Sequence, residues 1–459
     1  MADLVDELDD KLDEEPDEDR QEDTTRFGVR HGDERVVAIM LAVFGVLRVL
    51  SVRSTPLIYF DSIDYRTLDL LGNARRPFTV PLFYWVMPSD GWRVVEQVAF
   101  SAFAWIVLAF AVAAMLDDRR VRLVGMGAVL ALGLTTQVTN WDSAILSDSI
   151  AISLTVLLIA VALRWHRHPS PRATADVLIV TLLWTFAREA HVYFTVAGAI
   201  GVVGVAVWRR RERAFTWLAV GLVVIGVVAV AEDRRNQETS AENLAGVIGG
   251  RILPDASARA WFVDHGMPPL ADVPLQQIPR ERLQAIPDFE HWVETKALTT
   301  YAEYLLTHPA ALLSGPYGDL LEERPTFGDA PANKPVMLSP AEAYGRSRPV
   351  LPPPVEALLF DPGRTGSILL LTAIALIGAA VLAWQGRPDR RRRVPLLVIA
   401  AVLPYMFLAW HGSVFEPGRH AMPAAVALRV GVVALLAVLA DYVVGDRDAR
   451  AATSSEPSP

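Results

Sequence analysis

Residues 366–385, GSILLLTAIALIGAAVLAWQ, decide the fold, because they contain no charged side chain over the thickness of a lipid bilayer. A helix needs about 20 predominantly apolar residues to cross the hydrocarbon core. Backbone amides in that core must find their hydrogen bonds within their own segment, so the stretch has to be helical. The sequence therefore predicts a membrane-spanning helix here.

Nine further apolar blocks of similar length predict that the chain crosses the membrane about ten times. The chain has 459 residues, and 52% of them are hydrophobic, which is more than a water-soluble fold usually contains. The predicted spans lie near residues 36–53, 93–116, 121–139, 144–163, 174–191, 193–208, 214–231, 366–385, 394–410 and 421–442. The predicted fold class is an all-α polytopic membrane protein with a large extracytoplasmic loop.

Clusters of arginine between the blocks predict the orientation of the chain. The four loops that this threading places on one side contain fifteen arginines, whereas the short loops on the other side contain only Arg188 and Arg419. Positively charged loops stay in the cytoplasm. We therefore expect a multi-pass protein of a bacterial inner membrane with both termini in the cytoplasm. The fifteen are Arg119, Arg120, Arg122, Arg164, Arg167, Arg172, Arg209, Arg210, Arg211, Arg213, Arg387, Arg390, Arg391, Arg392 and Arg393.

The ends of the chain differ from its apolar middle. The first 23 residues contain thirteen acidic side chains against Lys11 and Arg20, which predicts a disordered tail and excludes a cleavable signal peptide at this position. Cysteine is absent, which excludes thiol chemistry. The predicted organisation is a disordered acidic cytoplasmic tail (1–34), an N-terminal transmembrane module (35–231) with a first extracytoplasmic loop (54–92), a large extracytoplasmic loop (232–365), a C-terminal transmembrane module (366–442) and a disordered cytoplasmic tail (443–459).

The two long outer segments are where we expect a functional site. The prolines and aromatic residues of the first loop are typical of a short helix lying in the membrane interface. The large loop contains one predicted helix near residues 290–308, and it lacks a nucleotide-binding glycine loop or a metal-spaced histidine pair. We interpret it as a lid over a site built by the first two outer loops.

Carboxylates at the outer ends of the predicted helices are the first candidate site residues. Asp61 and Asp64 lie three residues apart in YFDSIDYRTLDLLG and share one face if that segment is helical. Asp142 and Asp148 lie where the third predicted span gives way to the fourth. An alternative for Asp61 and Asp142 is that they cap helices. Asp148 lies deeper, where a charge is costly and usually lines a polar cavity.

Two further outer clusters contain candidate cations. TFAREAHVYF brings together Arg188, Glu189 and His191, and a guanidinium there can hold a lipid phosphate in a forked geometry. The alternatives are an Arg–Glu pair that anchors the interface and a histidine without a chemical role. A second set lies in AWHGSVFEPGRHAMPAAVALR and comprises His411, Glu416, Arg419 and His420. The alternative for these residues is that they are simply solvated, because polar side chains in a loop cost little free energy in water.

With Tyr65 beside Asp61 and Asp64, an acidic second outer turn (NWDSAILSDS), a large late outer loop and a terminal EPGRHAMP, the chain resembles the GT-C superfamily of membrane glycosyltransferases, including uncharacterised actinobacterial members. The resemblance implies inverting transfer of a sugar from a polyprenyl-phosphate donor to a glycan, lipid or protein acceptor outside the cytoplasm. It further implies a hexosyl- or pentosyltransferase with Asp61 as the base and Asp64 or Asp148 as an orienting carboxylate. Arg188 or Arg419 would hold the phosphate.

The resemblance has departures and alternatives. The first loop has Asp61-Ser62 where the protein mannosyltransferases have an adjacent Asp-Glu pair, so the acceptor class stays open. A divalent cation bound by Asp61, Asp64 and Asp148 is a possible cofactor. Membrane lipid is an expected partner and nucleic acid is not. A transporter or flippase of a lipid-linked substrate and a non-catalytic membrane scaffold are the competing functions, although no two-halved symmetry favours transport.

Overall fold

The computed structural model describes residues 33–52, 55–59, 61–68, 76–208, 213–233, 237–270, 286–313, 347–360, 366–386, 389–412 and 417–454. Nearly all of them are helical, and the only strand-like contacts among these residues are two isolated β-bridges. The all-α prediction is therefore confirmed for the described part of the chain.

All ten predicted spans are helical in the structure. Of the described helices, seven are long and apolar enough to cross a membrane. An eighth is reached if α6 and the short helical segment up to Ser143 form one span bent by 48°. The helices are α2 (Glu34–Ser51), α5 (Asp90–Ala113), α6 (Arg119–Gly133) with α7 (Thr136–Thr139), α8 (Asp148–Arg167), α9 (Pro171–Thr185), α10 (Glu189–Trp208), α11 (Arg213–Asp233), α19 (Gly366–Trp384), α20 (Arg393–His411) and α21 (Pro417–Ser454).

Two of the ten helices account for most of the difference between the ten predicted spans and the seven that are long and apolar enough. α9 has 15 residues, which is shorter than a bilayer core requires. α2 has the length of a span but contains three charged side chains, Glu34, Arg35 and Arg48. Length and composition therefore support seven or eight of the ten predicted crossings.

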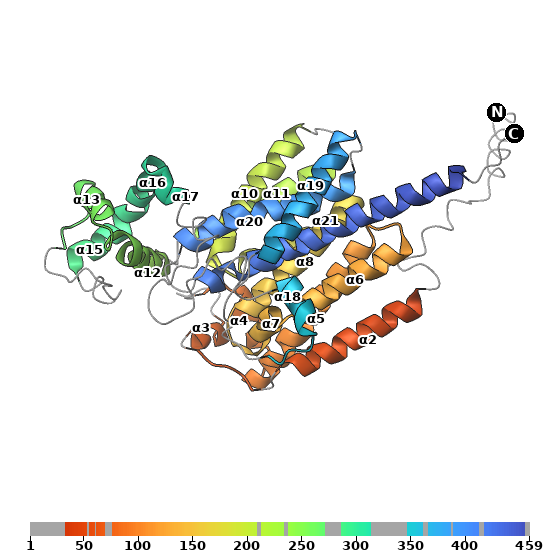
Figure 1. The fold of residues 1–459 in the computed structure, drawn as a ribbon. Coiled ribbons are helices and arrows are strands. Elements are labelled where there is room, and N and C mark those ends of the chain that lie inside the picture. Colours follow the sequence, from red (N-terminus) through yellow and green to blue (C-terminus); the bar gives the residue numbers. More distant parts are fainter. Residues whose placement is uncertain are drawn as a thin grey trace, which may run out of the picture.

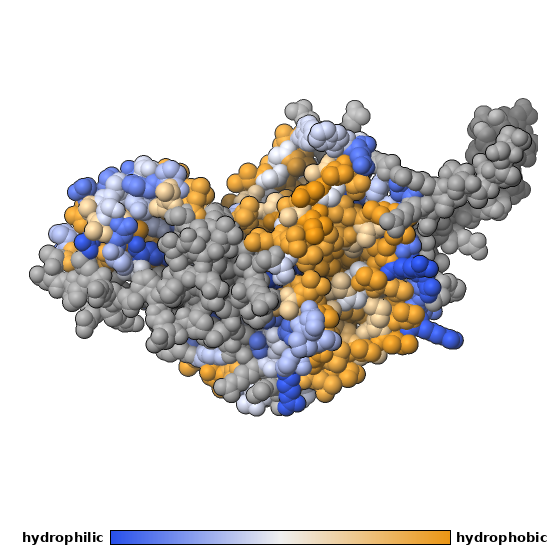
Figure 2. Space-filling view, in the orientation of Figure 1, coloured by the Kyte–Doolittle hydropathy of each residue, from blue (hydrophilic) through white to orange (hydrophobic). Residues whose placement is uncertain are grey.

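The bundle is built around α8, which packs against α5, α9 and α21 (Figure 1). α6 packs against α5 and α21, and α20 packs mainly against α21. The facing side chains of these helices, among them Trp105, Leu108, Val156 and Val430, are fully buried. Hydrophobic side chains also cover the outer faces of the bundle (Figure 2), and Ile200 on α10 is 70% exposed. An apolar exterior of this extent indicates a lipid environment.

The charged loops predicted to share one side of the membrane are in contact. Asp33, ahead of α2, pairs with Arg119 at the start of α6. Arg391, ahead of α20, lies 2.9 Å from Asp117 and 2.8 Å from Asp441 on α21. These contacts place the connections before α2, α6 and α20 together with the later part of α21, at the right-hand end of the bundle in Figure 1.

The described part of the large loop is more helical than the sequence predicted. Residues 237–270 and 286–313 form an outer helical subdomain with its own core around Phe262 and Phe289, at the end of the bundle opposite the arginine-rich loops (Figure 1). The single helix expected near residues 290–308 is one part of it. The subdomain comprises α12 (Gln237–Val247), α13 (Ala256–Asp264), α15 (Pro287–Trp292), α16 (Leu298–Thr307) and α17 (Pro309–Leu313), with π-helical turns at Ile248–Ile252 and Val293–Ala297.

The chain then returns to the bundle through residues 347–360. The backbone N–H of Ser347 donates to Asn140 at 2.6 Å, and Glu356 on α18 (Pro353–Phe360) accepts from the backbone N–H of Thr136 at 2.7 Å. The buried Arg429 of α21 lies over the ring of Phe360, 3.7 Å from its centroid. This segment is therefore held against α7, the turn that follows it and α21.

The C-terminal end also differs from the prediction. α21 continues to Ser454, although a disordered tail was predicted from residue 443. The alanines and arginines after Gly445 are strong helix formers, which explains the extension. The acidic tail falls, except for its last two residues, outside the described part of the chain.

Candidate functional site

The first outer loop brings two carboxylates to the end of the bundle. Asp61 immediately precedes α3 (Ser62–Arg66), which carries Asp64. The side chain of Asp61 makes no capping hydrogen bond to this short helix, so the capping alternative is not realised. α3 is held in place by Arg66, whose Nε and Nη2 donate to the two carboxylate oxygens of Asp90 at 3.1 and 2.5 Å. The loop thus presents Asp61 from a position fixed against α5.

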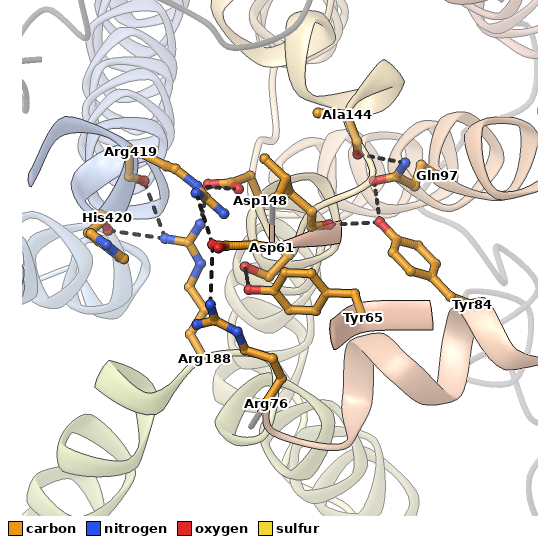
Figure 3. Close-up of polar contacts among 12 residues, drawn as sticks. Asp61, Tyr65, Arg76, Tyr84, Gln97, Ala144, Asp148, Arg188, Arg419 and His420 are labelled. Carbon is orange, nitrogen blue, oxygen red and sulfur yellow. Dashed lines mark hydrogen bonds and ion pairs between the residues drawn. The ribbon is translucent and has the colours of Figure 1, made fainter. Parts of the chain in front are cut away.

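Asp148 begins α8 and is completely buried between two arginines (Figure 3). Its Oδ1 accepts from Arg188, and its Oδ2 accepts from Nε of Arg419 at 2.9 Å. Nη1 of Arg188 also donates to the backbone carbonyl of Arg419 at 3.2 Å. Both acceptor oxygens of Asp148 are therefore used to orient two guanidinium groups that come from distant parts of the chain.

The arginines connect Asp148 to the first loop. Nη1 of Arg419 lies 3.6 Å from a carboxylate oxygen of Asp61. On its other side, Asp61 lies 3.2 Å from Nη2 of Arg76, which also approaches Asp64 and Glu189. We call Asp61, Asp64, Arg76, Asp148, Arg188, Glu189 and Arg419 the outer charge cluster.

The outer charge cluster is almost neutral. Its four carboxylates and three guanidinium groups give a formal charge of −4 + 3 = −1. Asp148 is fully buried, whereas Asp61 keeps 30% of its side chain exposed. The accessible carboxylate and the buried carboxylate are therefore suited to different tasks: reaction with a bound molecule for Asp61, and positioning for Asp148.

Other predicted residues have other surroundings. His191 is fully buried, stacks on Trp184 with ring centroids 3.9 Å apart and lies 2.8 Å from the hydroxyl of Tyr405. These contacts join α9, α10 and α20, as expected for a histidine without a chemical role. His420 lies beside the cluster (Figure 3), where its backbone carbonyl accepts from Arg188 at 3.5 Å. Glu416 falls outside the described residues.

Asp142 and His411 are not members of the outer charge cluster. Asp142 is buried in an ion pair with Arg48, at 2.6 Å, and accepts a hydrogen bond from Ser149 at 2.7 Å. Both contacts lie inside the bundle, so the side chain of Asp142 is used in packing the helices. His411 ends α20 and lies 2.7 Å from the hydroxyl of Tyr301 in the outer helical subdomain.

Two tyrosines of the first outer loop contact the outer charge cluster or the turn beside it. The ring of Tyr65 lies under the guanidinium of Arg76, 5.4 Å from its centroid, and its hydroxyl donates to Ser147 at 3.3 Å. Tyr84 on α4 (Thr79–Trp85) donates to the carbonyl of Leu146 at 2.7 Å. These bonds tie the first loop to the turn that leads into Asp148. The interfacial helix expected in this loop corresponds to α4, where Trp85 is 64% exposed.

Arg76 was not among the predicted site residues. It lies in RRPFTVP within a long outer loop, and an arginine in such a loop carries no positional signal by itself. Its only sequence cue was the unusual presence of two adjacent arginines outside the predicted cytoplasmic loops. The contacts with Asp61, Asp64 and Glu189 require the folded structure.

The divalent cation suggested by the sequence does not fit these residues. Asp148 is enclosed by Arg188 and Arg419, and Asp61 and Asp64 face Arg76. Among the described residues, no group of three acidic or histidine side chains is arranged to hold a metal ion. The oxygens that a hard cation requires are occupied by guanidinium groups.

Comparison with known proteins gives structural likeness only. No family model matches the chain, and no curated protein matches it. Its structure is similar to the oligosaccharyltransferase of Archaeoglobus fulgidus in the apo form, with a TM-score of 0.45, 12% identity and coverage of 91% of this chain and 52% of that one. It is also similar to archaeal oligosaccharyltransferase AglB from Archaeoglobus fulgidus in complex with an inhibitory peptide and a dolichol-phosphate, with a TM-score of 0.44, 12% identity and coverage of 94% and 53%.

The chain thus spans about half the length of the solved structures it resembles.

Proposed function

We propose that the protein is a membrane glycosyltransferase that moves a sugar from a polyprenyl-phosphate donor to an acceptor hydroxyl outside the cytoplasm. The observation that carries the proposal is the outer charge cluster itself: an accessible carboxylate, Asp61, lies 3.6 Å from an arginine whose own orientation is fixed by a buried carboxylate. This arrangement supplies a base and a phosphate-binding cation side by side.

The arginines account for the donor. A guanidinium binds phosphate oxygens in a planar, charge-assisted geometry. Arg188 and Arg419 are held by Asp148 before any ligand arrives, so little reorganisation is needed when a phosphate approaches. The apolar outer faces of the helices below them suit the polyprenyl chain. The cluster therefore recognises a phosphate at the end of a membrane lipid.

Asp61 accounts for the acceptor. In the proposed step, the acceptor O–H bond breaks and its proton passes to the Asp61 carboxylate. The acceptor oxygen forms a bond to the anomeric carbon of the sugar, and the bond between that carbon and the phosphate oxygen breaks. The electron pair leaves with the polyprenyl phosphate, whose charge Arg188 and Arg419 stabilise. Asp148 takes no proton because its oxygens remain bound to arginine.

Asp61→Asn tests the proposal. The variant keeps the size of the side chain but cannot accept the proton, so transfer should fall by about 10²- to 10⁴-fold. The measurement uses membranes containing the full-length protein, a panel of radiolabelled polyprenyl-phosphate hexoses and pentoses, and cell-envelope acceptors. Asp264→Asn, an exposed residue of α13 in the outer helical subdomain, is the matched control and should transfer at the wild-type rate. Undiminished transfer by Asp61→Asn at wild-type protein levels would remove Asp61 from this role.

A further inference from the structure

The end of the bundle opposite the outer charge cluster carries exposed arginines. The connections at this end touch one another: Arg391 lies 2.9 Å from Asp117, and Nε2 of His166 lies 3.1 Å from the backbone carbonyl oxygen of Arg390. Six arginines at the starts of α2, α6 and α9, at the end of α8 and just ahead of α20 are exposed and form no ion pair with another described residue (Figure 1). We call these six the basic face: Arg35, Arg120, Arg164, Arg167, Arg172 and Arg390.

Several acidic side chains at this end contact groups outside the basic face. Asp33 pairs with Arg119, and Asp441 lies 2.8 Å from Arg391. Asp118 accepts hydrogen bonds, at 2.8 and 2.9 Å, from two backbone N–H groups at the start of α6. The guanidinium groups of the basic face are therefore open to an anionic partner.

A segment of opposite charge joins the molecule at this face. Residues 1–23, which lie outside the described part of the chain, contain thirteen acidic side chains against Lys11 and Arg20, a net charge of 2 − 13 = −11. The described chain begins at Asp33, which is 2% exposed and lies 3.5 Å from Arg122. Residues 24–32 span at most about 30 Å when extended. The acidic segment can therefore reach every part of the basic face.

We propose that the acidic residues 3–23 bind the basic face. A single exposed ion pair contributes little, so the contact depends on many pairs formed together. Attachment through Asp33 favours this partner, because a short tether gives an effective concentration on the order of millimolar. Anionic lipid headgroups compete for the same arginines. The pairing of Asp33 with Arg119 and Arg122 already brings the start of the described chain onto this end of the bundle. The proposal does not depend on the proposed function.

Two spin labels on the full-length protein test the contact by pulsed electron paramagnetic resonance, since the chain has no cysteine of its own. Leu12→Cys labels the acidic segment, and His168→Cys labels an exposed position between Arg167 and Arg172. Nanodiscs containing phosphatidylglycerol supply the competing anionic lipid. Short label-to-label distances should be populated at about 0.1 M NaCl and lost at about 1 M, where the Debye length falls from about 10 to about 3 Å.

Two matched triple variants identify the arginines. Replacing Arg164, Arg167 and Arg172 together by Gln should remove the short distances at about 0.1 M NaCl. Replacing the same three by Lys keeps their charge and should retain the short distances. If the Gln variant does not survive purification, the salt dependence decides. The proposal is overturned if the distances respond to neither salt nor the Gln variant. It is equally overturned if short distances appear only in nanodiscs of phosphatidylcholine, because anionic lipid then occupies the basic face.

Discussion

Asp148 is a buried carboxylate whose two oxygens both contact arginines of the outer charge cluster. The sequence indicated a carboxylate placed too deep for a simple cap, with a possible orienting or catalytic role. In the structure, Arg188 and Arg419 surround it from both sides. In the proposed function, Asp148 positions these two arginines and the accessible Asp61 is the base.

Asp148→Asn should destabilise the protein and also weaken phosphate binding. Removing one partner of a buried ion pair leaves the other charge uncompensated and costs about 3–5 kcal/mol. Thermal unfolding in detergent measures the stability, and binding of polyprenyl phosphate measures the site.

Asp142→Asn is the matched control, because Asp142 is equally buried and pairs with Arg48 away from the outer charge cluster. It should lower stability by a similar amount and leave the affinity of the folded protein for polyprenyl phosphate unchanged. Equal losses of affinity in both variants would show that Asp148 acts only through stability.

At the scale of the helices, the joint between α20 and the outer helical subdomain is a compact set of polar and aromatic contacts. Arg251 lies over the ring of Trp410, 4.2 Å from its centroid, and donates to the carbonyl of the same residue. Tyr301 contacts His411 at 2.7 Å. Burial lowers the pKa of Arg251 to about 10, which leaves the guanidinium charged at neutral pH.

Trp410→Ala should therefore loosen the outer helical subdomain from the bundle. A desolvated cation–π contact contributes about 2 kcal/mol. Hydrogen exchange in residues 248–263 and 293–305 should rise, while exchange in α5 and α8 stays at the wild-type level. Trp384→Ala is the control, since Trp384 ends α19 and is 94% exposed. Unchanged exchange in Trp410→Ala would mean that this joint does not hold the subdomain.

The sequence could predict the helices of the bundle because each apolar block carries its own signal. All ten blocks proved to be helical, including α9 and α2, which are too short or too charged to count as spans. Most of the short helices of the outer helical subdomain were not predicted, because they pack on each other in a small core and their polar outer faces weaken any hydrophobic pattern.

Contacts between distant residues leave no local pattern in the candidate site either. Charges at the outer ends of apolar helices are conspicuous, so the sequence singled out Asp61, Asp64, Asp148, Arg188, Glu189 and Arg419 as candidates. Arg76 was not singled out, because its contacts are with side chains 12, 15 and 113 positions away, which no local pattern records. His191 and Glu189 were equally plausible candidates in the sequence. The structure distinguishes them, because His191 is buried among aromatic rings whereas Glu189 contacts Arg76.

At the scale of the whole molecule, the two ends of the bundle carry different groups of charged residues. The contacts of Asp33 with Arg119 and of Arg391 with Asp441 gather the basic loops at one end, and the outer charge cluster and the outer helical subdomain lie at the other. The positive-inside rule predicts that the basic loops lie in the cytoplasm and therefore that the cluster faces the extracytoplasmic side.

Single cysteines can test this orientation cleanly, because the chain contains none. Asp264→Cys, in the outer helical subdomain, should react with a membrane-impermeant maleimide in intact spheroplasts. His168→Cys, in the loop after α8, should react only after permeabilisation. Both positions are exposed in the folded protein, so burial does not decide the result. The reverse pattern of labelling would place the outer charge cluster in the cytoplasm.

The most direct test of the central claim is whether the outer charge cluster binds a lipid phosphate. Native mass spectrometry of the purified full-length protein should show one polyprenyl phosphate bound per chain and no comparable binding of the neutral polyprenol. Arg419→Gln should weaken the phosphate complex by about tenfold or more, as expected for the loss of a hydrogen bond to a charged group. Arg66→Gln, outside the cluster, should bind like the wild type. Equal binding of phosphate and alcohol, or an affinity that Arg419→Gln leaves unchanged, would contradict the account.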